Sequence, residues 1–123
     1  MQQINHLIDG EDVASTSGRS GPVSNPATGD QTGEVGFASV GEVDRAVASS
    51  RAAFDEWRNV SIARRTKILY EFRNAVVANV DEIAARLTAE HGKVGDDARG
   101  EVARGIENIE FSCGLADALK GSY

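Results

Sequence analysis

The sequence predicts an α-rich α+β fold in which a β-hairpin and a short strand precede four helices. Three observations lead to this prediction. The length of 123 residues suits one domain. Both prolines and several glycine-containing turns fall within the first forty residues, and from Ser39 onward apolar residues recur every three or four positions. We therefore expect one domain, with the hairpin and loops in residues 1–38 and the helices in residues 39–119.

The hairpin is predicted from the dipeptide Asp9-Gly10, which lies between the short segments 4–8 and 11–13. Glycine adopts positive φ without steric cost, and tight two-residue hairpin turns require positive φ. The dipeptide therefore predicts two antiparallel strands joined at this turn.

The rest of the first forty residues is predicted to be loop and one further strand. Residues 15–21 form a loop of small side chains, and residues 21–29, which contain both prolines, are extended or turning. Residues 33–38 alternate Val35 and Phe37 with smaller neighbours. This alternation predicts one more short strand.

The first predicted helix begins at Ser39, three residues before Glu42. This spacing is that of a capping box, in which the serine oxygen accepts a free backbone N–H and the glutamate accepts another in return. The pattern breaks at residues 59–61. The apolar stripe of this helix consists of Val43, Val47, Ser50, Phe54 and Trp57.

A second helix follows the break, and a third, short helix runs from residues 79–81 to Gly92, which suits a C-terminal cap. The helical periodicity predicts an inward face on each. The inward residues are Ile68, Leu69, Phe72, Ala75 and Val76 on the second helix and Ile83, Ala84 and Leu87 on the third, while Arg64, Arg65 and Arg73 are predicted to point outward.

The fourth predicted helix, residues 96–119, has two apolar faces. One contains Val102, Ile106, Ile109, Cys113 and Ala116, and the other continues from Arg104 and Asn108 through Phe111, Leu115 and Ala118. A helix that is apolar on two faces is normally covered on both. Either the other helices and the hairpin cluster around it, or part of its cover belongs to chain outside these 123 residues; we favour the second interpretation.

Composition excludes several classes of partner. The net charge is −6 and the pI about 4.8, which argues against nucleic acid and anionic membranes because both attract basic surfaces. No apolar run approaches the roughly 20 residues of a membrane span, and the N-terminus does not resemble a signal peptide. A single cysteine forms no internal disulfide. We expect a soluble, cytoplasmic protein.

The reactive residue types do not assemble a catalytic or metal site in the sequence. Cys113 lies on an apolar helix stripe and is expected in the core, where a thiol behaves as a small hydrophobe. His6 and His91 have no partner at ligand spacing, so no metal is expected. The glycines of residues 18–21 lie in a loop before a proline and do not form a phosphate-binding motif. No catalytic and no cofactor-binding residue is therefore assigned.

Arg104 is the one candidate binding residue. Glu101 precedes it by three residues, which favours an exposed helical ion pair that contributes a few tenths of a kcal/mol. Alternatively, its guanidinium faces a cavity and binds a substrate carboxylate through two hydrogen bonds. Its shared line with Phe111 and Leu115 favours a partly covered position, but residue chemistry alone favours the ion pair.

Several motifs in order resemble the start of the aldehyde dehydrogenase superfamily. They are Asn25-Pro26-Ala27-Thr28-Gly29, Ala53-Phe54-Asp55-Glu56-Trp57-Arg58, Ala63-Arg64-Arg65 and Glu90-His91-Gly92-Lys93. The stretch from Gly100 to Phe111 resembles the methylmalonate-semialdehyde dehydrogenase branch. The resemblance runs from Ile4 to Tyr123 and covers only the opening part of the family's length, which belongs to its Rossmann-like NAD-binding domain.

The resemblance implies a parent enzyme that uses NAD and coenzyme A to oxidise and decarboxylate malonate or methylmalonate semialdehyde, a step of valine catabolism. The family's catalytic cysteine, oxyanion-stabilising asparagine and NAD-binding turn lie downstream of this segment, as do its oligomerisation parts, and Cys113 does not match the nucleophile's motif. The fourth helix would line the substrate tunnel, and Arg104 would hold the substrate carboxylate.

These considerations lead to one main expectation and two alternatives. In the main one, the chain is the N-terminal fragment of a parent enzyme that is a homo-oligomer. The fragment alone is expected to be inactive, to bind no cofactor and to associate with itself through exposed apolar surface. The first alternative is a non-catalytic helical interaction module. The second is an aldehyde dehydrogenase of another substrate specificity, which would differ in the acid that its tunnel accepts.

Overall fold

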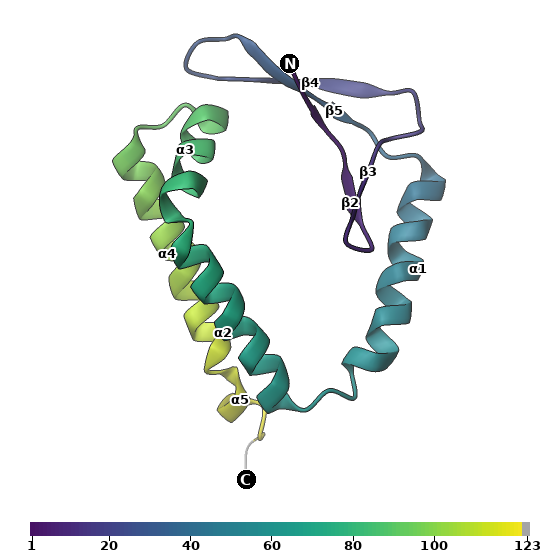
Figure 1. Ribbon diagram of the computed structural model, residues 1–123, viewed down its shortest axis with the longest axis vertical. Helices are drawn as coiled ribbons and strands as arrows, with labels where there is room; N and C mark the ends of the chain where they lie inside the picture. Colours follow the sequence, from purple (N-terminus) through teal and green to yellow (C-terminus); the bar gives the residue numbers. More distant parts are fainter. Residues whose placement is uncertain (122–123) are drawn as a thin grey trace. The chain divides into compact units, whose positions relative to one another are not determined.

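The computed structural model describes residues 1–121, which divide into two compact units. Unit 1, residues 1–59, contains five strands and one helix, and unit 2, which starts at Val60, contains only helices (Figure 1). The strand-then-helix order confirms the predicted fold class. The boundary follows residues 59–61, where the helical periodicity of the sequence breaks.

The predicted hairpin is present in unit 1. Strand β2 (His6–Ile8) pairs antiparallel with β3 (Glu11–Val13). The two turn residues both have positive φ, 59° at Asp9 and 77° at Gly10. This is the backbone conformation that suits a two-residue hairpin turn, so the dipeptide determines the register locally.

A second, three-stranded sheet in unit 1 was not predicted as such. Its central strand β5 (Gln31–Gly36) pairs in parallel with β1 (Gln2–Ile4) and antiparallel with β4 (Ser20–Ser24). The single strand predicted over 33–38 is β5, shifted by two residues. Strand β4 includes the end of the predicted 15–21 loop and the start of the predicted 21–29 segment, neither of which was predicted to be a strand.

Sequence features still explain this sheet. Pro22 has no backbone N–H to donate, and it is accommodated because β4 is an edge strand. The predicted segment 4–8 is divided at Asn5, so its first residues pair with β5 and its last with β3. Asn5 Nδ2 donates to Asp12 Oδ1 at 2.6 Å and fixes the division.

The turn between β4 and β5 is formed by the Asn25-Pro26-Ala27-Thr28-Gly29 motif. Asn25 Oδ1 accepts from the Ala27 backbone N–H at 2.9 Å, and the Gly29 N–H donates to the Asn25 carbonyl at 2.8 Å. Such side-chain-to-backbone bonds are how asparagine stabilises turns. The motif therefore has a structural role in this chain.

Helix α1 (Val40–Trp57) begins with the predicted capping box. Ser39 Oγ accepts from the Glu42 N–H at 3.3 Å, and Glu42 Oε2 accepts from the Ser39 N–H at 2.7 Å. The other carboxylate oxygen, Oε1, accepts from the Thr16 N–H at 2.7 Å. Glu42 is buried, and it joins the loop after β3 to the start of α1.

These hydrogen bonds lower the pKa of Glu42 to about 2, chiefly through the Ser39 and then the Thr16 backbone N–H. Because the folded pKa lies below the ordinary 4.5, the stabilisation from Glu42 is fully present above pH 4.5 and is lost as the pH falls toward about 2. We expect Glu42→Gln to lower the urea midpoint at pH 6, and the difference from wild type to shrink toward pH 2.5.

Equilibrium urea unfolding between pH 6 and pH 2.5 measures this effect. Glu56→Gln, at an exposed position on the same helix, is the matched control and should follow the wild-type profile. A Glu42→Gln difference that stays constant over this pH range would contradict the assignment.

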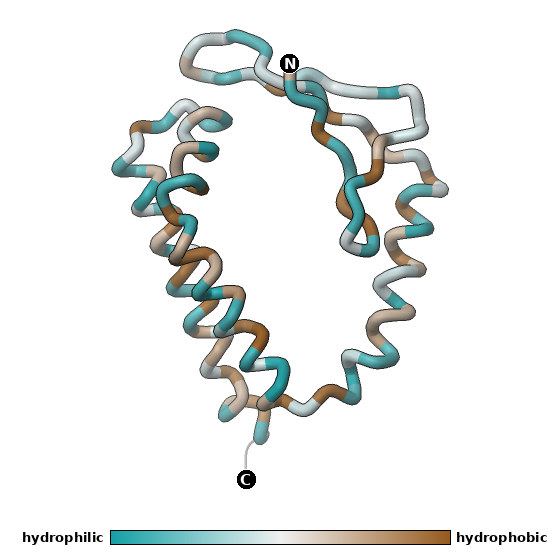
Figure 2. Tube along the Cα trace, in the orientation of Figure 1, coloured by the Kyte–Doolittle hydropathy of each residue, from teal (hydrophilic) through white to brown (hydrophobic). Residues whose placement is uncertain are grey.

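Unit 2 consists of α2 (Ile62–Ala78), α3 (Val80–His91), α4 (Gly95–Cys113) and the short α5 (Leu115–Ala118). Helix α4 packs against both α2 and α3, and hydrophobic and hydrophilic positions alternate along all three (Figure 2). The core is small and contains Ala84, Ala98 and Val102, against which Val76, Val80, Ile83, Leu87 and Ile106 pack.

Two predictions for unit 2 were wrong. The predicted 96–119 helix ends at Cys113, because Gly114 has low helix propensity and separates α4 from α5. On α2, Ile68 and Phe72 are exposed, whereas the predicted outward Arg73 is half-buried. Arg73 faces α4, where its Nε and Nη2 donate to Glu110 Oε1 at 2.8 and 2.7 Å.

The third helix was predicted correctly. It ends at His91, and Gly92 caps it in the left-handed conformation with φ of 77°. Within residues 1–121, no helix combines the length and the apolar character that crossing a membrane requires.

Candidate functional site

Cys113 lies at the end of α4 and is 4% exposed. Its predicted core position is confirmed. His6 belongs to unit 1 and His91 to unit 2. In the described part of the chain, no three His, Cys, Asp or Glu side chains lie close enough together to hold a metal ion.

Arg104 lines a surface hollow of unit 2 with a volume of about 520 Å³. The hollow lies between the turn that follows α3 and the first turns of α4. Its other lining residues are Lys93, Asp96, Asp97, Gly100 and Glu101. The structure thus places the predicted binding residue in a polar depression with four further charged side chains.

The favoured partner of Arg104 in the sequence, Glu101, is paired elsewhere. Lys93 Nζ donates to Glu101 Oε2 and forms a salt bridge with it. The pKa of Glu101 is lowered, and the largest cause is the hydrogen bond from Lys93, followed by the positive charge of Lys93. The charge of Arg104 makes the smallest contribution to this lowering. The predicted Glu101–Arg104 ion pair is therefore replaced by a Lys93–Glu101 pair, which sequence spacing did not indicate.

The guanidinium of Arg104 forms no hydrogen bond or ion pair with residues 1–121 of this structure. Its backbone carbonyl accepts from Asn108 Nδ2 at 3.0 Å, which does not involve the side-chain charge. Asp96 is paired with Arg99 at 3.4 Å. A guanidinium in this state has its donors available for a carboxylate, which it binds through two parallel hydrogen bonds.

The apolar line that continues from Arg104 is uncovered within unit 2. Phe111 is 74% exposed and Leu115 38%, whereas Val102 on the first face is 8% exposed. Arg104 is exposed within unit 2, as are Phe111 and Leu115, so the partly covered position stays a prediction that depends on chain outside these residues.

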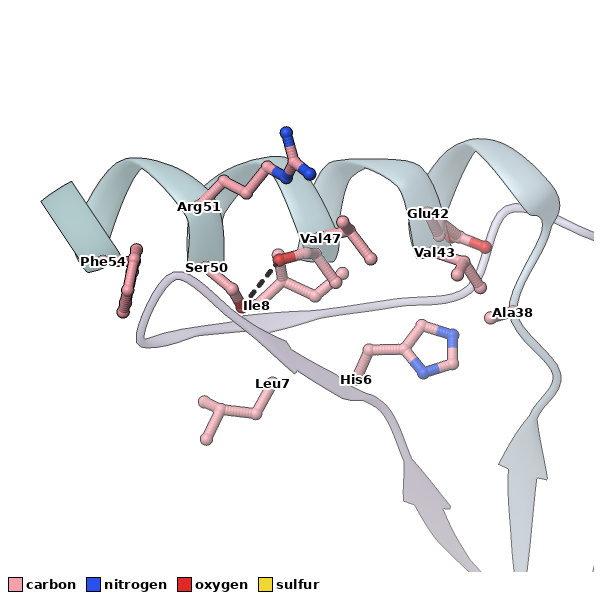
Figure 3. A pocket seen from close by; sticks show the side chains of 11 residues that line it. His6, Leu7, Ile8, Ala38, Glu42, Val43, Val47, Ser50, Arg51 and Phe54 are labelled. Carbon is pink, nitrogen blue, oxygen red and sulfur yellow. Dashed lines mark hydrogen bonds between the residues drawn. The ribbon is translucent and has the colours of Figure 1, made fainter.

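A second hollow, of about 590 Å³, lies in unit 1 between β2 and α1 (Figure 3). Sequence reasoning did not find it, although the α1 stripe that lines it was recognised as apolar. Its apolar walls include Leu7 and Ile8 from the hairpin and Val43, Val47 and Phe54 from α1. Its one carboxylate, Glu42, is engaged in the helix cap, and its other ionisable side chains are those of His6 and Arg51.

Comparison with known proteins identifies the family. Residues 13–123 match the aldehyde dehydrogenase family. The chain belongs to this family. It is 45% identical to malonate-semialdehyde dehydrogenase 3 of Geobacillus kaustophilus (strain HTA426), over 96% of this chain and 24% of that protein. The predicted resemblance to the aldehyde dehydrogenases is thus confirmed.

Solved structures of aldehyde dehydrogenases agree with this assignment. The chain superposes on methylmalonate-semialdehyde dehydrogenase from Oceanimonas doudoroffii with a TM-score of 0.94 and 39% identity, over 99% of this chain and 25% of that one. An NAD-dependent aldehyde dehydrogenase from Sinorhizobium meliloti gives a TM-score of 0.85 and 30% identity, over 96% and 24%. The chain spans about a quarter of the length of these aldehyde dehydrogenases.

Two of the motifs that carry the resemblance lie at the Arg104 hollow of unit 2. Glu90-His91-Gly92-Lys93 forms the end of α3 and the turn that supplies Lys93, and residues 100–111 lie on α4. Lys93 was missed as a site residue because its partner lies on another element. The available signal was Gly92, whose left-handed cap turns the chain just before Lys93.

Proposed function

We propose that this chain supplies the N-terminal part of an NAD-dependent, CoA-acylating malonate- or methylmalonate-semialdehyde dehydrogenase, in which Arg104 binds the substrate carboxylate. The observation that carries the proposal is the guanidinium of Arg104, unpaired within residues 1–121, in a hollow where the Glu101 carboxylate is bound to Lys93. The similarity to a malonate- and a methylmalonate-semialdehyde dehydrogenase supports the substrate class.

In this proposal a catalytic cysteine elsewhere in the full-length protein attacks the aldehyde. NAD would supply the hydride acceptor and coenzyme A the thiol that takes up the acyl group, both held by residues outside this segment. The residues of this chain have the earlier task of holding the acid end of the substrate. When the guanidinium holds the carboxylate of the semialdehyde, the aldehyde group at the other end of the substrate remains free to react. Substrate binding and the chemical step then involve different residues.

The sequence contains no glycine-rich phosphate-binding motif, and the starts of α1, α3 and α4 do not suit the pyrophosphate of NAD or coenzyme A. Phosphate groups favour helix N-termini with free N–H groups and no competing negative charge. The first turns of α3 and α4 each carry two acidic residues, and Glu42 occupies the start of α1. We therefore assign no cofactor-binding residue to this segment and expect the 123-residue chain to be inactive alone.

The function is tested in a full-length enzyme that carries this segment. NADH formation should be faster with malonate semialdehyde than with propanal, and the product should be an acyl-CoA thioester in the presence of coenzyme A. The absence of thioester formation, or a preference for the neutral aldehyde, would contradict the proposed reaction. We propose that this enzyme is a cytoplasmic homo-oligomer, a state that sedimentation of the same preparation measures.

The exposed apolar line on α4 favours a second candidate function, a helical interaction module. Phe111 is 74% exposed, and Leu115, which continues the line on α5, is 38% exposed. Exposed patches of this kind promote association. We expect the isolated chain to self-associate and to bind a hydrophobic dye, and Phe111→Ser to weaken both.

Sedimentation velocity over a concentration series measures the association. Ala103→Ser, at an exposed and small position on the same helix, is the matched control and should behave as wild type. A monomeric wild-type chain that binds no dye would contradict the expectation.

A further inference from the structure

The Glu101 carboxylate lies between two cations that come from different elements. Lys93 belongs to the three residues that join α3 to α4, whereas Arg104 follows Glu101 by three residues on α4 itself. Residues three apart on a helix are neighbours on its surface, so Arg104 is within reach of Glu101. All three side chains line the same hollow, and Glu101 pairs with Lys93.

The backbone explains why Lys93 obtains this partner. Gly92 adopts φ of 77° at the end of α3 and turns the chain back toward α4. The Lys93 side chain is 24% exposed, compared with 53% for Glu101, so Lys93 lies against the protein over much of its length. A lysine side chain held in this way loses less conformational entropy when it forms an ion pair than a solvated arginine such as Arg104 does. This difference favours the Lys93–Glu101 pair across the turn.

We propose that Lys93 is a positioning residue: by binding the Glu101 carboxylate it keeps the Arg104 guanidinium available to the carboxylate of the substrate. The inference rests on the proposed function of Arg104. Without Lys93, Glu101 becomes an unpaired anion one turn before Arg104. It then competes for the same guanidinium and also repels an incoming carboxylate.

The charges around the hollow agree with this role. Asp96 is bound by Arg99, and Glu101 by Lys93. The pKa of Glu101 is lowered mainly by Lys93 and least by Arg104. Of the three carboxylates that line the hollow, Asp96 and Glu101 are thus paired with other cations, and Asp97 is the third. The pairing of Glu101, one turn before Arg104, is what leaves the Arg104 guanidinium available to an external anion.

The first test uses NMR of the 123-residue chain with malonate as the probe. We expect malonate to shift the Arg104 Nε–Hε signal in the wild type. In Lys93→Met the signal should already be displaced without malonate, because Glu101 has moved to Arg104, and malonate should bind roughly three- to fivefold more weakly. Lys93→Arg should retain wild-type binding.

The double variant Lys93→Met/Glu101→Gln separates positioning from a general loss of positive charge. It has the net charge of the wild type and lacks the competing carboxylate, so it should restore both the signal position and the malonate affinity. Unchanged affinity in Lys93→Met, or a double variant that is as weak as the single one, would overturn the inference. Circular dichroism establishes that each variant remains helical.

The outcomes also distinguish this inference from the proposed function. If malonate leaves the wild-type Arg104 signal unmoved, the proposed carboxylate-binding role of Arg104 is wrong. The proposed effect of Lys93 on substrate binding is then wrong as well. A displacement of the signal in Lys93→Met that Glu101→Gln reverses would still establish the exchange of partners. In the full-length enzyme, Lys93→Met should raise KM roughly three- to fivefold for the carboxylated semialdehyde, with kcat and the KM of a neutral aldehyde unchanged.

Discussion

Replacing Arg104 with leucine in the full-length enzyme should raise KM for a carboxylated semialdehyde by the equivalent of about 1.5–3 kcal/mol, the contribution of a hydrogen bond to a charged group. The reason is that leucine has no donor for the carboxylate that the free guanidinium would bind. The KM for propanal, which has no carboxylate, should stay the same. Steady-state kinetics with the two aldehydes measures the difference.

Two further variants sharpen this test. Arg104→Lys keeps the charge but loses the paired donors, so its KM should lie between those of wild type and Arg104→Leu. Arg86→Leu removes an exposed arginine that pairs with Glu82 on α3, and it should leave both KM values unchanged. An Arg104→Leu effect of equal size on both aldehydes would exclude a role in carboxylate recognition.

The second large effect is expected from Ala98→Asp. Ala98 is 0% exposed at the centre of the unit 2 core, beside Ala84 and Val102. A carboxylate placed there has no partner, and burying it costs several kcal/mol, whether it remains charged or takes up a proton. The stability of a unit this small is on the order of 3–9 kcal/mol. We therefore expect loss of most of its helical signal at 25 °C.

Thermal unfolding followed by circular dichroism measures this loss. Ala103→Asp places the same side chain on the exposed face of the same helix and should change the free energy of unfolding by about 0.5 kcal/mol or less. Similar melting curves for the two variants would mean that Ala98 is not in a packed core.

The features that the sequence predicted correctly are local ones. The Asp9-Gly10 turn, the Ser39 capping box and the Gly92 cap each depend on residues within four positions of one another. The strands β1 and β4 depend instead on pairing with β5, and β1 lies about thirty residues from its partner. Three-residue strands carry too little periodicity to indicate such a partner.

At the candidate site, too, local features were predicted correctly and contacts between elements were not. Residue type and family resemblance together identified Arg104, but helical spacing assigned it to Glu101, the neighbour along the chain. The actual partner of Glu101 comes from the turn before α4. Likewise, periodicity correctly placed Val76 of α2 toward the core. It placed Arg73 outward, however, and Arg73 contacts Glu110 of α4.

The position of Glu42 has a consequence for how unit 1 opens. One carboxylate accepts the backbone N–H groups of both Thr16 and Ser39, which are more than twenty residues apart in the chain. Releasing either segment exposes a carboxylate that the other segment alone does not satisfy. We therefore expect the loop after β3 and the first turn of α1 to unfold locally as one cooperative unit, with their amide hydrogens exchanging with solvent through a shared event.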